Sequence, residues 1–559
     1  MTSQTATESS VTPVMGKEAK KRIRWGIFLP PWILVVTLLI LNLINFEAFM
    51  KVVNGATGWI LTNFSWLFNA TTFVCVVLVV AAYFAPFSKV RFGGSKAKPM
   101  MSQRNFVWIV LCTIMAAGIL LWAAAEPMYH IYGPPKQITE GPGSQGAIAW
   151  AIQTILLEWT FSPMAIYAVP AILFAFVFYN MKKEYSIGSM LYPVLGNNIT
   201  PKVMPVVDCL CLFALVAGMA ASLGSGILLL AGGVESLTGI KSEPFTWRIA
   251  AALIVSAFVA SAASGVMNGI RILSSINSRI YMLMGAFVFV FGPTAYLLDL
   301  LVEGVGLYLN DFFKISLWTS TTSGDAWSRW WPTFYWCNWM AWMPVTSVFL
   351  GRICKGFSVR EAITVIFIFP ALFSIVWLVL FSGTSINFEL AGLGINEAMK
   401  TSGTEGATYA IFRQLPLAVL SIPVFLLIVF VSFVTAADSN TNAMSGLCTT
   451  GLSTEDQESP MILKIVWGMT IGCLSVIMLS AAGVDGLKMA SNLGGFPNVF
   501  LLVLLCISFA KVLRNPQKYD LFKEDYDQHG NPILSQRLEP ENYDPTKKRS
   551  LLYRILLDV

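Results

Sequence analysis

Residues 331–363, WPTFYWCNWMAWMPVTSVFLGRICKGFSVREAI, decide the fold class of this chain. The first part, 331–351, carries no charged residue and is long enough to cross the roughly 30 Å hydrocarbon core of a bilayer as a helix. The segment that follows contains Arg352, Lys355 and Arg360, and basic loops beside apolar spans are typical of cytoplasmic connections. The stretch therefore predicts a membrane-spanning helix that ends in the cytoplasm.

The composition of the whole chain extends this prediction. Of its 559 residues, 56% are hydrophobic and only 12% are charged, whereas about 25% of the residues in an ordinary soluble protein are charged. We therefore predict an all-α polytopic membrane protein with about 12 transmembrane helices. The apolar segments lie at roughly 26–47, 60–85, 105–125, 147–179, 204–232, 247–268, 277–302, 331–351, 361–384, 415–437, 461–483 and 490–512.

The spans leave no other segment of domain size. We predict one membrane domain at 25–513, between an N-terminal tail at 1–24 and a C-terminal tail at 514–559. Both tails are polar and are expected to be mobile. Residues 1–24 lack the short apolar core of a cleavable signal peptide, so we expect none to be removed there.

Lys and Arg residues lie near alternate span ends. They gather in the N-terminal tail and in residues 89–104, 181–186 and 352–360, whereas the intervening loops carry few or balanced charges. Because cytoplasmic loops carry an excess of Lys and Arg, we expect both termini in the cytoplasm and the protein in the inner, plasma membrane, surrounded by lipid bilayer. Topology then accounts for the net charge of +6, and no nucleic-acid partner is expected.

The sequence contains no constellation of catalytic residues. Its two histidines form no HExxH motif, its nine cysteines are scattered without a CxxC pair, and it has no Walker-type glycine loop. We therefore predict that the chain is not an enzyme, uses no cofactor and does not hydrolyse ATP by itself.

An aromatic stripe marks the span at 331–351 as a candidate binding site. Its residues, at helical steps of four, four, three and four, are Trp331, Tyr335, Trp339, Trp342 and Thr346, with Asn338 beside them. An interfacial belt would stop after the first turn or two, so the stripe is either packing between helices or the wall of a cation site. Cation–π attraction of about 0.5–2 kcal/mol per ring suits a quaternary ammonium group.

A second aromatic group lies in the fourth span. Trp159, Pro163 and Tyr167 are spaced i, i+4 and i+8, and Pro163 cannot donate to the carbonyl of Trp159, so we expect a kinked helix with a free carbonyl. Such helices line cavities in transporters. Glu158 adjoins Trp159 inside the span, where an ionised carboxylate is costly. Glu158 could carry a proton or attract a cation, or it could be a neutral or paired structural group.

Five segments together resemble the betaine/carnitine/choline transporter (BCCT) family. They are WAAAEPMYH (122–130), EWTFSPMAIYA (158–168), NGIRILSSIN (268–277), the stretch 331–363 and FVTAADSNT (433–441). The resemblance extends in order from about residue 25 to 512. It implies two inverted five-helix repeats, formed by spans 3–12 after two N-terminal helices, that alternate access to a central site. A homotrimer is implied in the same way.

The resemblance also assigns residues to the substrate site. The tryptophan box of the family corresponds to Trp159, Tyr167, Trp339 and Trp342, with Trp331 and Tyr335 further along the same face. Members of the family transport glycine betaine, carnitine, γ-butyrobetaine or choline. The aromatic geometry inferred from the spacing requires a ligand of this kind.

Two positions of the box depart from the pattern of the family. Met164 and Asn338 stand where many members have tryptophan. Thioethers pack readily against aromatic rings, so Met164 could simply fill space. Asn338 could donate to a carboxylate or another oxygen of the substrate. The preferred ligand could therefore differ from glycine betaine in the position of its polar group.

The residues that bear on ion coupling match neither the sodium-coupled members of the family nor its sodium-independent exchangers. Sodium-coupled members carry a glycine-rich third span and paired hydroxyls in the tenth, whereas this chain keeps only Gly118 of those glycines and has Ala436 after Thr435. Sodium-independent exchangers place arginine and methionine where this chain has Asn277 and Thr346. We expect no metal site apart from a weak Na⁺ site at Thr435, and the candidate coupling ions are Na⁺ and H⁺.

These observations predict a secondary active transporter of quaternary ammonium compounds that works by sodium-independent exchange or by proton coupling. The first alternative is a sodium-coupled betaine symporter for osmolyte or nutrient uptake. An alternative from another class is a membrane sensor that binds the same ligands without transporting them, against which the absence of a recognisable signalling domain in the tails argues.

Overall fold

The computed structural model describes residues 22–114, 118–196, 203–263, 267–450 and 459–540. Within these residues the regular structure is helical, apart from a short antiparallel pair of strands, β1 (Arg22–Ile23) and β2 (Thr449–Thr450). Seven of the described helices are long and apolar enough to cross a membrane, or eight when one bent pair is counted as a span. The prediction of an all-α polytopic membrane protein is confirmed.

The predicted spans fall on single long helices or on pairs of described helices that follow one another closely in the chain. These are α1 (Trp25–Ile44), α2 (Phe46–Phe84), α3 (Gln103–Ile114) with α4 (Ile119–Tyr132), α5 (Gln145–Trp159) with α6 (Phe161–Ala175), α8 (Val203–Thr238), α9 (Pro244–Ala263), α10 (Met267–Phe291) with α11 (Thr294–Leu317), α13 (Pro332–Ile353), α14 (Val359–Ile363) with α15 (Phe369–Leu390), α18 (Ala418–Leu447) and α19 (Met461–Arg514).

Shorter elements lie in the connections, beside the breaks and in the tail. The α-helices among them are α7 (Tyr192–Leu195), α12 (Trp327–Trp330), α16 (Ile395–Ser402), α17 (Gly406–Gln414) and α20 (Pro516–Tyr519). Single π-helical turns follow α6 at Phe176–Asn180 and α14 at Thr364–Ile368, and 3₁₀ turns lie at Pro86–Lys89, Ile187–Leu191 and Lys523–Asp525.

The kink predicted near Pro163 is present as a break between α5 and α6. Thr160 has non-helical φ and ψ angles of −115° and −115°, and Pro163 lies in the first turn of α6. Because the break interrupts the helical hydrogen bonds, the carbonyl of Glu158 is free to accept a hydrogen bond from the Trp339 indole at 3.1 Å. The break thus joins α5 to α13.

The span predicted at 277–302 is wrong in its extent. Helix α10 ends at Phe291, and α11 begins at Thr294 with its axis turned by 106°. Gly292 and Pro293 separate the two helices, and a proline both lacks a backbone donor and restricts the residue before it. The apolar run therefore belongs to two helices, and α11 packs against α5 and α15.

Helix α19 covers the last two predicted spans. Ala482 and Gly483 interrupt it with non-helical angles, and Gly483 has a φ of +56°, which side-chain-bearing residues rarely adopt. The interruption lies where the prediction separates 461–483 from 490–512. It brings the residues just after Gly483 towards α4 and α13.

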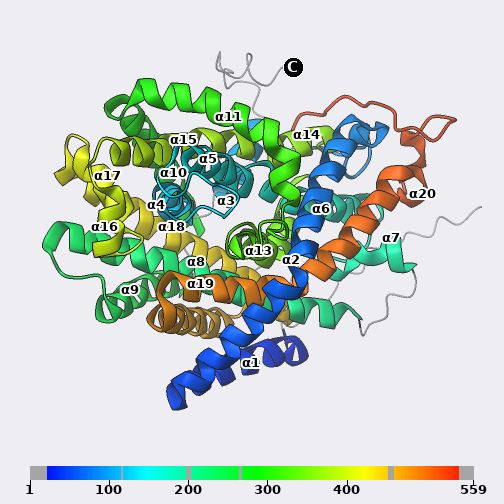
Figure 1. Ribbon diagram of the computed structural model, residues 1–559. Coiled ribbons are helices and arrows are strands. Elements are labelled where there is room, and N and C mark those ends of the chain that lie inside the picture. The colour runs from blue at the N-terminus through cyan, green and yellow to red at the C-terminus, as the bar shows by residue number, and fades with distance from the viewer. Residues whose placement is uncertain (1–21, 115–117, 197–202, 264–266, 451–458, 541–559) are drawn as a thin grey trace, which may run out of the picture.

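Helix α13 lies near the centre of the molecule in Figure 1 and packs against α6, α19, α8 and α2. Glycines permit the close approach of its neighbours. A Cβ atom at Gly351 would meet the carbonyl oxygen of Ala171 in α6, and one at Gly495 of α19 would clash with the backbone of Cys337. Small residues at helix contacts are typical of packing within membranes.

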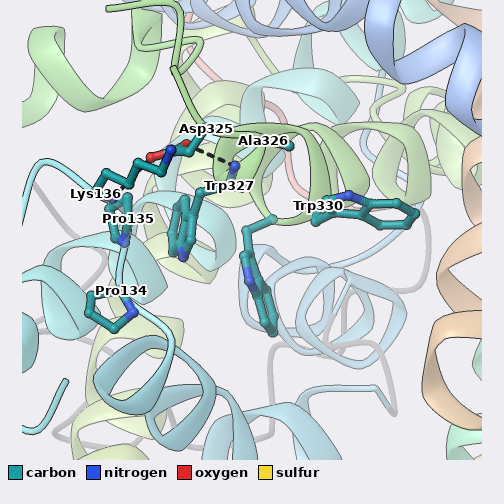
Figure 2. Close-up of a pocket in the computed structure, with 8 residues that line it drawn as sticks. Pro134, Pro135, Lys136, Asp325, Ala326, Trp327 and Trp330 are labelled. Carbon is teal, nitrogen blue, oxygen red and sulfur yellow. Dashed lines mark hydrogen bonds between the residues drawn. The ribbon is translucent and has the colours of Figure 1, made fainter. Parts of the chain in front are cut away.

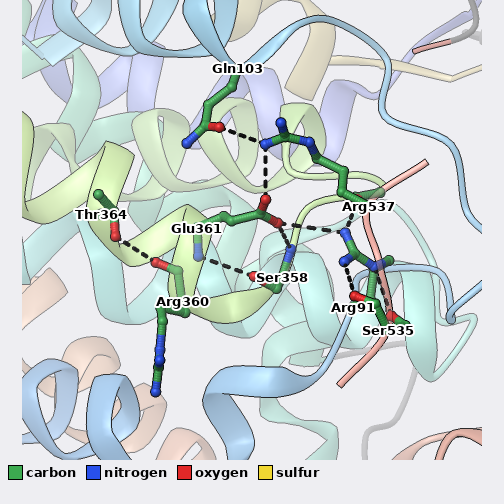
Figure 3. A network of polar contacts seen from close by, with 9 residues as sticks. Arg91, Gln103, Ser358, Arg360, Glu361, Thr364, Ser535 and Arg537 are labelled. Atoms are coloured by element: carbon green, nitrogen blue, oxygen red, sulfur yellow. Dashed lines mark hydrogen bonds and ion pairs between the residues drawn. The ribbon is translucent and has the colours of Figure 1, made fainter. Parts of the chain in front are cut away.

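The C-terminal tail, as far as it is described, is folded onto the membrane domain, so the prediction of a mobile tail is wrong for this part. Arg91, in the loop after α2, donates to the Ser535 hydroxyl at 3.0 Å and to the Gly356 carbonyl at 2.7 Å. Arg537 of the tail forms an ion pair of 2.9 Å with Glu361, which also caps α14 (Figure 3).

A second anchor of the tail lies at Asn180. Its amide nitrogen donates to the Arg91 carbonyl and to the Asp520 carboxylate, at 3.1 and 2.8 Å. Lys182 lies over the Phe522 ring at 5.3 Å. The basic loops after α2, α6 and α13 therefore lie on the same face as the tail, an arrangement that agrees with the orientation inferred from their charges.

Candidate functional site

Three residues of the predicted box, together with the predicted binding residue Tyr335, form one buried aromatic cluster. Trp159 ends α5, Tyr167 belongs to α6, and Tyr335 and Trp339 are successive turns of α13. The Trp159 ring lies edge-to-face with Tyr335 and Trp339, at centroid distances of 5.2 and 5.5 Å, and Trp339 meets Tyr167 at 5.6 Å. We call these four residues the aromatic cluster.

The other predicted residues of the box lie around this cluster. Met164 is fully buried in α6. Asn338 is half-buried and faces α19, where its carbonyl oxygen accepts a hydrogen bond from Ser491 at 3.0 Å. Trp342 is half-buried and lies against Gly218 of α8. The stripe along α13 therefore faces two different neighbours, and its role as a substrate wall stays a prediction.

Trp331, at the outer end of the stripe, contacts a cation that belongs to the chain itself. The ammonium group of Lys488 in α19 lies 3.5 Å from the centroid of the Trp331 ring and 5.4–5.9 Å from the rings of Phe334, Trp122 and Tyr129. Lys488 is only 5% exposed. Four aromatic rings, of which Trp331 belongs to the stripe, surround this buried amine, and cation–π attraction favours its charged form.

A buried group of acids and a histidine lies directly beside the aromatic cluster. Glu126 and His130 are one turn apart on α4, Glu158 is in α5, and all three are 0% exposed. His130 Nε2 lies 3.3 Å from Glu126 Oε1 and 3.9 Å from Glu158 Oε2. Glu126 Oε2 accepts hydrogen bonds from the Trp159 indole, at 2.9 Å, and from the Tyr335 hydroxyl. We call Glu126, His130 and Glu158 the buried triad.

Sequence reasoning identified Glu158 but missed the rest of this arrangement. The i, i+4 spacing of Glu126 and His130 inside an apolar segment was a usable signal, because charged residues within spans are costly and usually paired. Lys488 gave no such signal, since it follows a helix break near a span end, where a lysine ordinarily reaches water.

The structure separates the predicted coupling residues into two groups. Gly118 and Thr346 are near the aromatic cluster: a Cβ at Gly118 would lie 3.9 Å from the Trp159 ring, and Thr346 interacts with the Tyr167 hydroxyl. Asn277 is elsewhere and donates to Ser432 at 2.7 Å. The Thr435 hydroxyl donates to carbonyls of its own helix, at 2.8 Å for Val431.

A surface pocket adjoins the Lys488 side of the stripe. Its volume is about 330 Å³, and it is lined by Pro134, Pro135, Lys136, Asp325, Ala326, Trp327, Trp330 and Trp331. Figure 2 shows the prolines opposite the Trp327 ring. Because Trp331 contacts both the pocket and Lys488, one indole separates the surface from the buried cation.

Asp325 fixes the wall of this pocket. Its carboxylate accepts hydrogen bonds from the backbone amides of Trp327 and Lys136, each at 3.0 Å (Figure 2). Partial burial raises the pKa of Asp325, but these two amides and the hydroxyls of Ser320 and Ser323 outweigh burial and leave the pKa below its ordinary value. The ionised carboxylate thus holds two loops together at the mouth of the pocket.

Comparisons with known proteins give an independent view of the chain. The sequence model of a family described as "BCCT, betaine/carnitine/choline family transporter" matches residues 26–518. A probable glycine betaine transporter of Desulfitobacterium hafniense (strain Y51) is 27% identical, over 88% of this chain and 95% of that protein. An ectoine/hydroxyectoine transporter of Virgibacillus pantothenticus is 28% identical, over 82% and 90%. The osmo-dependent choline transporter BetT2 of Acinetobacter baylyi is 27% identical, over 86% and 70%.

Proposed function

Because this chain belongs to the betaine/carnitine/choline transporter family, we propose that it carries a quaternary ammonium compound, such as choline or glycine betaine, across the plasma membrane by alternating access. The observation that carries this proposal is the aromatic cluster, whose four rings come from α5, α6 and α13. The names of two of the relatives, a probable glycine betaine transporter and a choline transporter, support the ligand class. Two polar tails facing the cytoplasm complete the proposed topology.

The aromatic cluster is suited to a cationic group that has no hydrogen-bond donor, such as trimethylammonium. Its rings meet edge to face, so each presents part of its electron-rich face within the cluster. A trimethylammonium group bound among them would separate Trp159 from Trp339 and replace ring contacts with cation–π contacts. The break at Thr160 gives α5 and α6 freedom to make this movement.

For the coupling mode, we propose sodium-independent exchange or proton coupling. A Na⁺ site requires several oxygen ligands, and here Thr435 offers one hydroxyl oxygen while Ala436 offers no side-chain oxygen. The buried triad supplies titratable groups next to the aromatic cluster instead. Sodium symport is the alternative, and the uptake experiment below distinguishes it from exchange and from proton coupling.

The test is uptake of labelled choline, glycine betaine, carnitine and γ-butyrobetaine into proteoliposomes that contain the full chain. Each ligand is measured with a Na⁺ gradient, a pH gradient or unlabelled ligand inside. We expect saturable uptake of at least one ligand that internal ligand or a pH gradient accelerates without Na⁺. Acceleration by Na⁺ alone would contradict the coupling proposal, and binding without counterflow for every ligand would favour a sensor.

A further inference from the structure

We infer that the buried triad of Glu126, His130 and Glu158 is a proton-binding site, and that its proton and a cationic substrate in the aromatic cluster replace one another during transport. The inference rests on the proposed function and assigns its coupling ion. The triad and the aromatic cluster are then two adjoining binding positions, and either a proton in the first or a substrate cation in the second supplies the positive charge.

The first support is that several polar atoms of the triad lack a hydrogen-bond partner. Both carboxylate oxygens of Glu158 and the Nδ1 atom of His130 have no hydrogen-bond partner among the described residues, although both side chains are fully buried. Glu158 Oε2 points to within 3.9 Å of His130 Nε2. A buried polar group without a partner is costly. A proton on one of the two neighbouring carboxyl groups, Glu126 and Glu158, would remove one buried charge and supply a donor.

The second support is the balance of charge. Two carboxylates enclosed with one imidazole cannot all be ionised without compensation in a site that excludes water. The charged and titratable groups that act on the triad from neighbouring helices are Lys488 of α19 and the hydroxyl of Tyr335 in α13. Lys488 faces Asp485 as well as the triad. At least one proton is therefore needed within the triad when no other cation is near.

The third support is the direct contact between the triad and the aromatic cluster. Glu126 accepts hydrogen bonds from the Trp159 indole and the Tyr335 hydroxyl, so its charge helps to set the positions of both rings. An ionised carboxylate accepts such bonds more strongly and attracts a substrate cation beside Trp159. A protonated triad loses this attraction, so a bound proton lowers the affinity for the substrate cation. By linkage, a bound substrate cation lowers the affinity of the triad for a proton to the same extent.

These steps define an exchange with balanced charge. A cation such as choline enters the aromatic cluster as the triad releases one proton to the side from which the cation came. After the conformational change and release of the cation, the triad takes up one proton on the other side. One positive charge therefore crosses in each direction, and net uptake of choline is accompanied by net export of protons.

The experiment measures the affinity of the purified full chain for labelled choline as the pH is lowered. Competition with a single proton should weaken the affinity by up to about tenfold for each pH unit. Glu158→Gln, which has the same shape but does not titrate at this side chain, should flatten this slope. Glu303→Gln, at an exposed position of α11, is the matched control and should retain it.

Two further measurements on the wild-type protein test the exchange of proton and cation without the Glu158→Gln variant. Addition of choline to the wild-type protein in weak buffer should release protons, and proteoliposomes with an acidic interior should take up choline faster than those without a pH gradient. Choline affinity independent of pH, no proton release, or binding of glycine betaine without any binding of choline would each overturn the inference. If none of the four labelled ligands binds or exchanges, the proposed function itself fails.

Discussion

At the scale of single residues, Trp339 shows how the fold and the proposed site share one side chain. Its ring contacts Trp159 and Tyr167, and its indole donates to the free carbonyl of Glu158. The side chain is also only 2% exposed, so its removal would leave a cavity. Effects on ligand binding and on stability have to be measured separately.

Replacement of Trp339 by alanine should weaken choline or glycine betaine binding by about tenfold or more, because a cation–π face is lost. Trp467→Ala is the matched control, since Trp467 is fully buried but packs against Phe28. Both variants should lose about 3–5 kcal/mol of stability. Equilibrium binding of labelled ligand distinguishes them, and equal losses of affinity in both would contradict the role of Trp339.

Glu405 is a second residue whose ionisation should affect the stability of the protein. It lies between α16 and α17, outside the membrane spans. Burial raises its pKa to about 7; a hydrogen bond from the Ser242 hydroxyl, at 2.5 Å, acts against this increase, and the nearby Glu235 carboxylate adds to it. The pKa in the folded protein therefore lies above the ordinary value of 4.5. Folding favours the protonated carboxyl.

The stability contributed by protonated Glu405 should be complete below the ordinary pKa and should be lost as the pH rises through about 7. The melting temperature of the wild-type protein should fall more between about pH 4.5 and 7 than that of Glu405→Gln, which cannot ionise. Glu397→Gln, at an exposed side chain, should behave like the wild type. Parallel declines in wild type and Glu405→Gln would refute this account.

At the scale of elements, helix breaks and close helix contacts position the site. The break at Thr160 turns Trp159 towards α13, and the break at Gly483 places Lys488 next to Trp331. The contact between α13 and the second half of α19 depends on Gly495, which adjoins the backbone of Cys337. The geometry of the stripe therefore depends on residues that have no functional side chain.

Gly495→Ala should destabilise the protein by about 1–3 kcal/mol, because the added methyl group meets backbone atoms that cannot move aside easily. Gly306→Ala is the matched control in α11, where a Cβ meets no atom within 4 Å, and it should be neutral or stabilising. Thermal unfolding in detergent measures both changes. A Gly495→Ala protein as stable as the wild type would mean that α19 approaches α13 less closely than described.

At the scale of the whole molecule, the C-terminal tail joins loops that are far apart in the sequence. Arg91, 6% exposed, binds the tail at Ser535 and the loop at Gly356, and Arg537 binds Glu361 at the start of α14 (Figure 3). Burial lowers the pKa of Arg91, an effect that the Glu361 carboxylate partly offsets. The tail thereby links the loop after α2 to the segment between α13 and α14.

Arg91→Ala should release the tail, because Ser535 loses two donated hydrogen bonds at once. We expect faster cleavage by trypsin within residues 515–540 of the purified protein. Arg104→Ala, at an exposed position in the first turn of α3, is the control and should leave the cleavage rate unchanged. A tail that stays protected in Arg91→Ala would show that Asn180 and Arg537 are sufficient to hold it.

The sequence by itself determined the class of the protein, the positions of most spans and the aromatic stripe on α13. Hydropathy and helical periodicity depend only on residues that are close in the sequence, so both can be recognised from the sequence without the tertiary structure. The same local chemistry predicted the kink near Pro163. It failed at 277–302, where Gly292 and Pro293 divide a continuous apolar run, and at the tail, whose polar residues find partners in three loops.

Only the tertiary structure decided which polar residues meet inside the molecule. Glu158 was recognisable as a costly charge, but its proximity to His130 depends on the packing of α4 against α5. Lys488 reaches the stripe only because α19 is interrupted and then packs against α13. Contacts between distant segments depend on helix orientation and breaks, which no local pattern encodes, and these contacts create the buried triad.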